Sequence, residues 1–175
     1  IISAADEVID SIDADELAKL FSLKADPEDE DSEKNKKKME TTRDHLAEAL
    51  YQKGLALAEI ESIKGEKPSA LAASEAVSSD LRSDLFEENF KELTKWVDVK
   101  SSKYGTLYVL RERRFGRLGT ALKVLNDMIQ DDGEPPKKKF YEMKLSLLDE
   151  IGWNHLLTYE RQWMHVRFPP SLPLF

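Results

Sequence analysis

Residues 118–131, LGTALKVLNDMIQD, decide the fold class of this 175-residue chain. An α-helix completes a turn every 3.6 residues, so apolar side chains that recur at intervals of three and four share one face. Asp132-Gly133 and Pro135-Pro136 follow directly, and such pairs end a helix. The stretch therefore predicts an amphipathic helix whose buried face carries Leu118, Ala121, Leu122, Leu125, Met128 and Ile129.

The regions around residues 118–131 show the same periodicity, and we expect further helices over 103–115, 136–151 and 153–167. Two of these helices begin about 33 residues apart, close to the 34-residue period of tetratricopeptide helix hairpins. We therefore predict an all-α fold, in which helical hairpins stack as a short tetratricopeptide-like right-handed superhelix.

The remainder of the chain divides by composition, and we expect a single helical domain over residues 1–175. A dense run of charges around Pro27 is typical of a solvated loop, and a Ser/Ala-rich stretch further on is typical of a flexible insert. The expected parts are acidic N-terminal helices over 1–23, a charged loop over 24–35, a long helix over 36–61, the insert over 62–80, a helical-hairpin body over 81–167 and an extended tail over 168–175.

The long helix has a glycine, Gly54, on the apolar face that it shares with Leu46, Leu50, Leu57 and Ile60. Glycine in a helix interior costs about 1 kcal/mol relative to alanine. We expect the compensation to be the close approach of another backbone at this position.

Composition favours helices and excludes several classes of protein. Nearly half of the residues are Ala, Glu, Lys, Leu or Arg, which lose little rotamer freedom in a helix. The chain has no cysteine, so a disulfide framework, a thiol nucleophile and a thiolate metal site are excluded. We expect neither a signal peptide nor a membrane span, since the sequence offers no matching pattern and no apolar run of sufficient length. Its first residues are Ile1-Ile2 rather than Met, which we interpret as the mark of a fragment from a longer polypeptide.

The formal net charge of −8 is unevenly distributed, because the first 33 residues carry twelve acids and only two bases. Positive charge, in contrast, is concentrated in RERRFGR, residues 111–117. Its arginines could form a solvated face, pair with an acidic surface in this chain, in a neighbouring copy or in a protein partner, or bind nucleic acid phosphates. Helical spacing divides them over several faces and disfavours nucleic acid. The candidate interaction residues here are Arg111, Arg113, Arg114 and Arg117.

Motifs for catalysis and metal binding are absent: there is no GxSxG, no Gly-rich phosphate loop and no HExxH. His45, His155 and His165 are far apart, and the latter two with Glu160 fit no standard ligand spacing. We interpret His155, beside two leucines, as a core or boundary residue. The acidic run 26–33 lacks the central glycine of a calcium loop. We predict no catalytic residue, no metal site and no cofactor.

Aromatic residues and the C-terminal tail offer further candidate contacts. Trp96, Trp153 and Trp163 lie on helix stripes, so we expect them in the core. Trp and Arg also anchor interfaces, and Trp163 with Arg167 is therefore an alternative contact site. The ending PPSLPLF is expected to be extended, because proline lacks the amide donor that a helix needs. Docking of this tail on the body is favoured by Leu172, Leu174 and Phe175.

Five strings, in order, resemble the C-terminal region of the tripeptidyl peptidase II family. They are IDSIDADELA (9–18), YQKGLALAE (51–59), Trp96 with Val97-Asp98, FGRLGTALK (115–123) and the ending GWNHLLTYERQW…FPPSLPLF. The insert over 62–80 and the extra Leu118 depart from the animal pattern, and a plant-type member would explain both. Members share the end pattern formed here by Gly152, Trp153, His155, Trp163, Pro169, Pro170 and Phe175.

The resemblance implies a role within a larger enzyme. The family comprises large cytosolic serine exopeptidases of the subtilisin type, which remove tripeptides from free N-termini. Their catalytic Asp, His and Ser lie in an N-terminal domain, outside the region that resembles this chain. The C-terminal region of the family is a tetratricopeptide-like superhelix within a very large homo-oligomer.

Our leading hypothesis is therefore a non-catalytic cytoplasmic module that supports folding and homo-oligomeric assembly. Its expected partners are other copies or other domains of the parent peptidase, with no nucleic acid and no membrane. The alternative is a tetratricopeptide-like adaptor that binds a protein or peptide in a concave groove.

Overall fold

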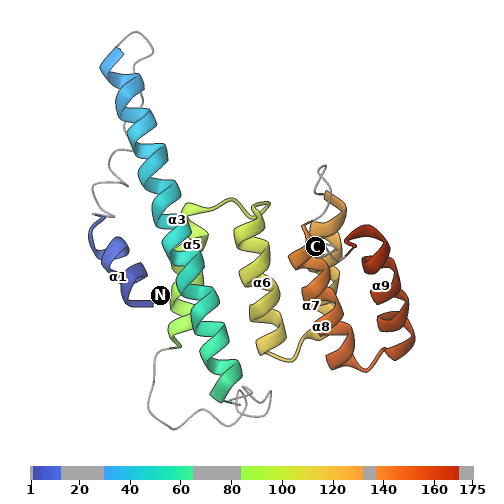
Figure 1. The fold of residues 1–175 in the computed structure, drawn as a ribbon. Helices are drawn as coiled ribbons and strands as arrows, with labels where there is room; N and C mark the ends of the chain where they lie inside the picture. Colours follow the sequence, from blue (N-terminus) through green and yellow to red (C-terminus); the bar gives the residue numbers. More distant parts are fainter. Residues whose placement is uncertain (1, 13–29, 65–83, 132–136, 170–175) are drawn as a thin grey trace, which may run out of the picture. The chain divides into compact units, whose positions relative to one another are not determined.

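The computed structural model of the chain describes residues 2–12, 30–64, 84–131 and 137–169 (Figure 1). These ranges contain helices and no β-strand, so the predicted all-α class is confirmed. The helices are α1 (Ile2–Asp10), α3 (Glu30–Lys64), α5 (Leu85–Trp96), α6 (Ser102–Arg114), α7 (Leu118–Asp131), α8 (Lys138–Ile151) and α9 (Asn154–Arg167).

The described residues form two compact units, and the division falls within α6. The first unit comprises α1, α3, α5 and the part of α6 that ends at Leu107. The second comprises the rest of α6, from Tyr108, together with α7, α8 and α9. The single domain over 1–175 and the tetratricopeptide-like superhelix remain predictions.

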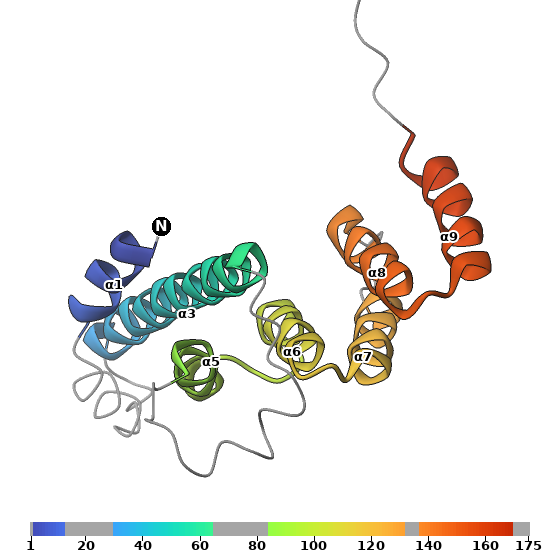
Figure 2. The ribbon, with the colours of Figure 1, turned by 90° about the horizontal axis from the view of Figure 1, so that it is seen from below.

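In the first unit, α3 lies between α1 and α5 and packs against both (Figures 1 and 2). Asp84 caps α5, since its Oδ1 accepts a hydrogen bond from the Glu87 amide at 3.2 Å. An ion pair of 2.5 Å between Lys53 Nζ and Asp6 Oδ1 links α3 to α1. The buried apolar residues of α3 and α5 are Leu46, Ala47, Ala49, Leu50, Tyr51, Leu57, Phe86, Phe90 and Leu93.

The long helix begins earlier than its sequence suggested. The expectation of a loop over 24–35 is wrong for residues 30–35, which form the first turns of α3. Glu and Lys are good helix formers, and acidic residues in a first turn interact favourably with the helix dipole. A dense charge run is therefore compatible with a helix wherever no proline interrupts it. The N-terminal part of α3 projects beyond α1 and α5 (Figure 1).

Gly54 lies on the buried face of α3, where a side chain has no room. A Cβ atom at this position would lie 2.6 Å from Cδ1 of Leu107 and 3.0 Å from Nδ2 of Asn89. Our expectation that another backbone approaches Gly54 is therefore wrong. Two side chains, Leu107 and Asn89, make the close approach instead. The Asn89 amide is held in place because it donates to the Leu50 carbonyl at 2.8 Å.

In the second unit, α8 lies between α7 and α9 (Figure 2). The four helices α6 to α9 begin and end within two residues of their predicted ranges. Gly152 ends α8 in the left-handed conformation at φ 83°, which glycine adopts without steric cost. The predicted stripe of α7 is confirmed, and the buried core consists of Val109, Ala121, Leu122, Leu125, Phe140, Leu147, Leu148 and Leu157.

Other expectations concern residues outside the described ranges. These are the second acidic helix near the N-terminus, most of the insert over 62–80, and the tail from residue 170 onward.

The close packing at Gly54 generates a stability prediction. We expect Gly54→Ala to lower the free energy of unfolding by up to about 2 kcal/mol, because overpacking costs about 1–3 kcal/mol and the gain in helix propensity offsets about 1. The control is Gly119→Ala in α7, where a Cβ atom meets nothing within 4 Å. Urea unfolding followed by circular dichroism measures both. Equal effects of the two substitutions would contradict the assignment.

Candidate interaction surfaces

The turn between α6 and α7 gathers the predicted arginines around one carboxylate. Gly116 adopts φ 70°, and its amide donates to the Arg113 carbonyl at 3.0 Å. The Arg117 amide donates to the Glu112 carbonyl at 2.9 Å. This pair of hydrogen bonds is a Schellman motif, which requires a left-handed residue where glycine stands. The reversal of the chain brings the Arg117 side chain back to Glu112.

Glu112 is the buried acceptor of this cluster, with 2% of its surface exposed. The Arg117 guanidinium binds both of its oxygens, Nε to Oε2 at 2.5 Å and Nη2 to Oε1 at 2.7 Å. Arg111 Nη1 lies 3.4 Å from Oε1. The hydrogen bonds from Arg117 hold the pKa of Glu112 below its ordinary value, against the opposing effect of burial. The pair is bidentate, the stronger kind of charged hydrogen bond.

The other members of the arginine cluster also have partners within the second unit. Arg113 Nε lies 2.6 Å from Glu150 Oε2 and links α6 to α8. The Phe115 ring is approached by Arg111 at 5.2 Å and by Arg117 at 4.7 Å from its centroid. Arg114 also takes part in an interaction. Much of the positive charge therefore stabilises the unit itself, and contact of these arginines with another molecule or with residues 1–33 remains a prediction.

The second predicted contact site, Trp163 with Arg167, lies where α9 packs on α8. The Trp163 ring lies 5.0 Å from the Tyr141 ring, and the Arg167 guanidinium lies 5.2 Å from the centroid of Trp163. The Phe168 ring contacts Tyr141 from the end of α9, at 5.7 Å. Burial raises the pKa of the Tyr141 hydroxyl, with Arg167 opposing and Glu160 adding to the rise. Trp163 is half-buried, and Phe175 lies outside the described residues.

Two expectations about side-chain burial are wrong. Trp153 is 53% exposed, because it stands at the residue before α9 and not on the helical stripe. His155 is exposed as well, and so is His165. Glu160 accepts a hydrogen bond from Lys144 at 2.7 Å, across α8 and α9.

In the described ranges, no group of three His, Asp or Glu side chains could hold a metal ion. No helix in the same ranges is long and apolar enough to cross a bilayer.

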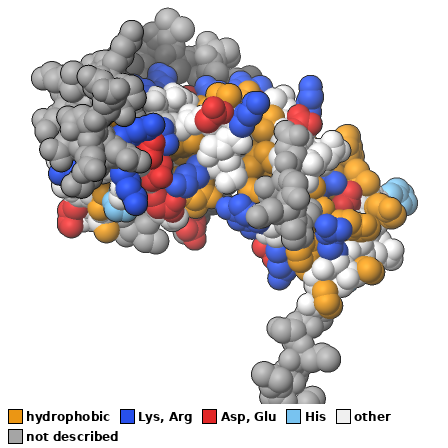
Figure 3. Space-filling model, turned by 90° about the horizontal axis from the view of Figure 1, so that it is seen from above, with side chains coloured by type: hydrophobic (Ala, Val, Ile, Leu, Met, Phe, Trp, Pro, Cys, Tyr) orange, Lys and Arg blue, Asp and Glu red, His pale blue; other side chains and the backbone are white. Residues whose placement is uncertain are grey.

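The sequence reasoning missed an exposed apolar surface on α9. Among the described residues, half of the exposed large apolar side chains belong to this helix and the residue before it. In Figure 3, hydrophobic side chains reach the surface at the right-hand end, where α9 lies. The sequence does carry a signal for this surface, because the apolar residues of α9 cover more of the helix circumference than a single buried stripe requires. The exposed residues are Trp153, Leu156, Tyr159 and Val166.

Two grooves lie in the second unit. One, of about 340 Å³, is formed by α6 and α8, and its lining combines the apolar Val109, Leu110 and Met143 with the charged Arg113, Lys139 and Glu142. The other, of about 190 Å³, is formed by α8 and α9. Both are lined by apolar and charged side chains.

The fold and these surfaces define a class of protein: a helical segment built from amphipathic helices. Comparison with known proteins shows which protein this helical segment resembles. The chain is 67% identical over all 175 residues to tripeptidyl-peptidase 2 of Oryza sativa subsp. japonica, and 65% identical to that of Arabidopsis thaliana. It is 28% identical over 178 aligned residues to tripeptidyl-peptidase 2 of Drosophila melanogaster.

The chain is thus related over its whole length to a segment of tripeptidyl-peptidase 2, and the resemblance to a plant-type member is confirmed. It spans 12% of the length of each plant relative. No family model matches it, and no solved structure does.

The buried carboxylate yields a prediction about stability and pH. We expect Glu112→Gln to lower the free energy of unfolding by about 1–3 kcal/mol at pH 7, because Arg111 and Arg117 lose their charged acceptor. A carboxyl whose folded pKa is lowered contributes stability that is present above its unfolded pKa, near 4.3, and is lost as pH falls through the folded pKa. The difference between wild type and variant should therefore be constant at pH 6–7 and shrink in acid.

Denaturant unfolding of both proteins from pH 7 to pH 3 measures this difference. The control is Glu150→Gln, because Glu150 pairs with Arg113 at the surface, where such pairs contribute about 0–1 kcal/mol. A wild-type advantage that stays unchanged down to pH 3 would refute the role assigned to Glu112.

Proposed function

We propose that this chain is a non-catalytic helical segment of a tripeptidyl-peptidase 2, and that it supports folding and homo-oligomeric assembly of the parent enzyme. The parent would be a serine-type peptidase that removes tripeptides from free N-termini of peptides. A cytoplasmic location, and partners that include neither nucleic acid nor membrane, belong to the same proposal. The observation that carries it is the end-to-end match to a small part of a much longer named peptidase.

The non-catalytic character is supported by the side chains present. A hydrolase of the serine type needs a nucleophile, a base and an orienting acid within hydrogen-bond reach of one another. His155 and His165 are exposed on α9, and no hydrogen bond to a serine is found for either in the described part of the chain. The catalytic residues of the parent are accordingly expected outside this segment.

A role in assembly is supported by the projecting part of α3. Its residues 36–38 are lysines with exposed side chains, beyond the stretch that α1 and α5 cover (Figure 1). A helical extension without a packed face is marginal in water. Contact with another part of the parent, or with another copy, would stabilise it.

A tetratricopeptide-like adaptor is the second candidate, and the groove between α6 and α8 favours it. The groove would bind a peptide with an apolar side chain, since Val109, Leu110 and Met143 line it beside charged side chains of both signs. Light scattering of the 175-residue chain over a concentration range separates the two proposals. Self-association supports assembly, whereas a strict monomer that binds such peptides supports the adaptor.

The assembly proposal predicts an effect of charge reversal in the full-length parent. We expect Lys36→Glu, Lys37→Glu and Lys38→Glu together to shift the parent toward smaller species in analytical ultracentrifugation and to lower tripeptide release per protomer. The matched control reverses Lys137, Lys138 and Lys139, which changes the net charge equally at another exposed lysine triplet.

Deletion of the whole segment is the stronger version of the same test. A parent without it that still forms the normal assemblies, with normal activity, would overturn the proposal. So would tripeptide release by the isolated 175-residue chain.

A further inference from the structure

The groove between α8 and α9 has an apolar part, made by three half-buried side chains. Leu145 belongs to α8, and Met164 and Phe168 belong to the end of α9. Phe168 is held in place, because its amide donates to the Met164 carbonyl at 2.8 Å and its ring lies 5.7 Å from the ring of Tyr141. An apolar group that enters the groove is removed from water among these side chains, which is favourable.

The charged side chains of the same groove are exposed, and most of them are basic. Lys138 of α8 and Arg161 of α9 each contribute a positive charge, and Glu142 contributes a negative one. His165, which is also exposed, adds an imidazole that can donate a hydrogen bond. The groove therefore carries an excess of positive charge and of hydrogen-bond donors.

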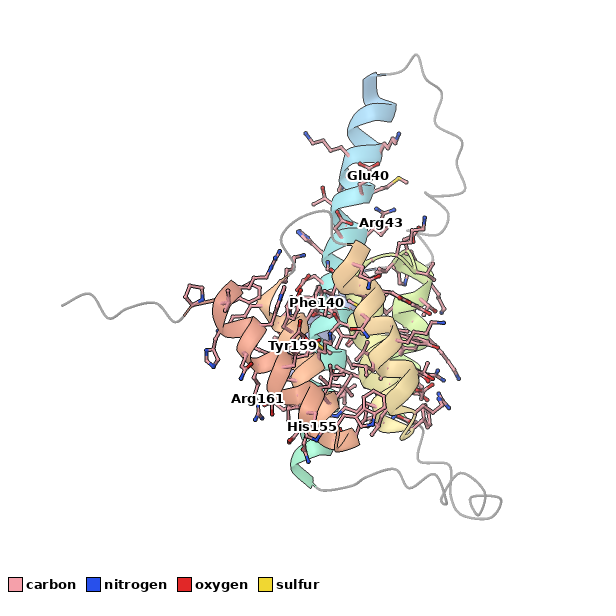
Figure 4. The ribbon with its side chains drawn as sticks, turned by 90° about the vertical axis from the view of Figure 1, so that its right-hand side faces the viewer. Glu40, Arg43, Phe140, His155, Tyr159 and Arg161 are labelled. Atoms are coloured by element: carbon pink, nitrogen blue, oxygen red, sulfur yellow. The ribbon has the colours of Figure 1, made fainter. Side chains whose placement is uncertain are left out.

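Arg161, labelled on α9 in Figure 4, is the cation that is available to a ligand. Among the described residues, no carboxylate pairs with it. Glu142 lies nearer to Lys138, with 3.5 Å between Oε1 and Nζ, and exposed pairs of this kind contribute little. A carboxylate from outside the chain would thus meet a guanidinium without displacing an acid of the described part of the chain.

The groove between α6 and α8 differs in this respect, although it shares Glu142 with the groove of α9. Its Arg113 already pairs with Glu150 at 2.6 Å. Its Lys139 lies over the Phe140 ring, with Nζ 5.1 Å from the centroid. A carboxylate would have to compete with Glu150 there, so the groove of α9 suits a negatively charged group better.

The size of the groove restricts the ligand further. Pockets that enclose a whole small molecule measure about 300–1,000 Å³, and this one measures about 190 Å³. It therefore has room for one amino-acid residue and not for a longer ligand. The C-terminal residue of a peptide presents a side chain and a carboxylate on the same Cα. An internal acidic residue has its charge at the tip of the side chain, and a second residue would have to make the apolar contact.

We propose that this groove binds the C-terminal residue of a peptide. The apolar side chain of that residue packs against Leu145, Met164 and Phe168, and its carboxylate accepts hydrogen bonds from the Arg161 guanidinium. Capture of a terminal carboxylate is a recurring mode of peptide recognition, and a planar guanidinium can bind both carboxylate oxygens. The ligands are thus peptides that end in an apolar residue with a free carboxylate. This inference goes beyond the assembly role proposed above and does not depend on it.

Titration of a peptide into the isotope-labelled 175-residue chain, followed by NMR, tests the proposal. The probe is Gly-Ser-Gly-Ser-Leu with a free carboxylate, added up to about 2 mM, since weak specific complexes have a Kd below that concentration. We expect saturable shifts of the amide signals of Met164 and Phe168. The signal of Val109, in the groove between α6 and α8, should not move.

Two changes to the peptide separate the contributions of its groups. Amidation of the C-terminus removes the charge, and we expect it to raise Kd about tenfold or more, because hydrogen bonds between charged groups are the stronger kind. Replacement of the terminal leucine by serine removes the apolar side chain and should raise Kd about tenfold as well.

Substitutions in the chain supply the second arm. Arg161→Gln should weaken binding of the free acid about tenfold and leave binding of the amidated peptide unchanged, because only the free acid offers the guanidinium a charged partner. The control is Lys123→Gln, which removes a positive charge at an exposed position of α7 and should change neither affinity. Phe175→Ser is measured as well, so that the chain's own apolar C-terminal residue cannot compete with the peptide. Circular dichroism confirms that each variant keeps its helices.

Several results would overturn the proposal. Absence of saturable shifts in both the wild type and Phe175→Ser would mean that the groove binds no such peptide. Equal affinity for the free acid and the amide would mean that the carboxylate is not recognised. Shifts at Val109 in place of Met164 would put the peptide in the groove between α6 and α8. None of these results bears on homo-oligomeric assembly, which charge reversal on α3 tests in the parent.

Discussion

An isolated helix of 12 to 15 residues is marginal in water, and α5 to α9 have only 12 to 14 residues each. Each of these helices therefore depends on the burial of its apolar stripe against a neighbour. In the second unit, Leu125 and Leu148 are fully buried, and burial of a side chain of this size contributes about 1.5–3 kcal/mol. Because α8 packs against both α7 and α9, loss of its stripe would expose both neighbours.

The same dependence explains how the charged residues are used. Helices that pack closely bring their ends together, and charged side chains at these ends must find partners or remain in water. Glu112 is buried where α6 ends, and Arg117 reaches it only because Gly116 reverses the chain. Lys144 and Glu160 form an ion pair that joins the middle of α8 to the middle of α9. The charges thus stabilise the packing of the helices, which the apolar stripes establish.

Parts of the described surface are not covered by other helices. In the second unit, α9 exposes Tyr159 and Val166, and in the first unit the beginning of α3 extends past its neighbours. The chain matches tripeptidyl-peptidase 2 of two plants over its full 175 residues and spans 12% of their length.

By itself, the sequence determined that the chain is helical, where α6 to α9 begin and end, and which family it resembles. These features depend on local periodicity, on Gly and Pro at helix ends, and on strings of identical residues, all of which are readable along the chain. The sequence also showed that the arginines are clustered along the chain and predicted close packing at Gly54.

Only the tertiary structure decided which partners these residues find. Arg117 contacts Glu112 and Arg113 contacts Glu150 because of the left-handed turn at Gly116 and the packing of α6 near α8. Tyr159 and Val166 are exposed because, among the described helices, α9 has a neighbour on one side only. Periodicity shows that a face is apolar, but burial depends on whether another element covers that face, and this is a property of the folded arrangement.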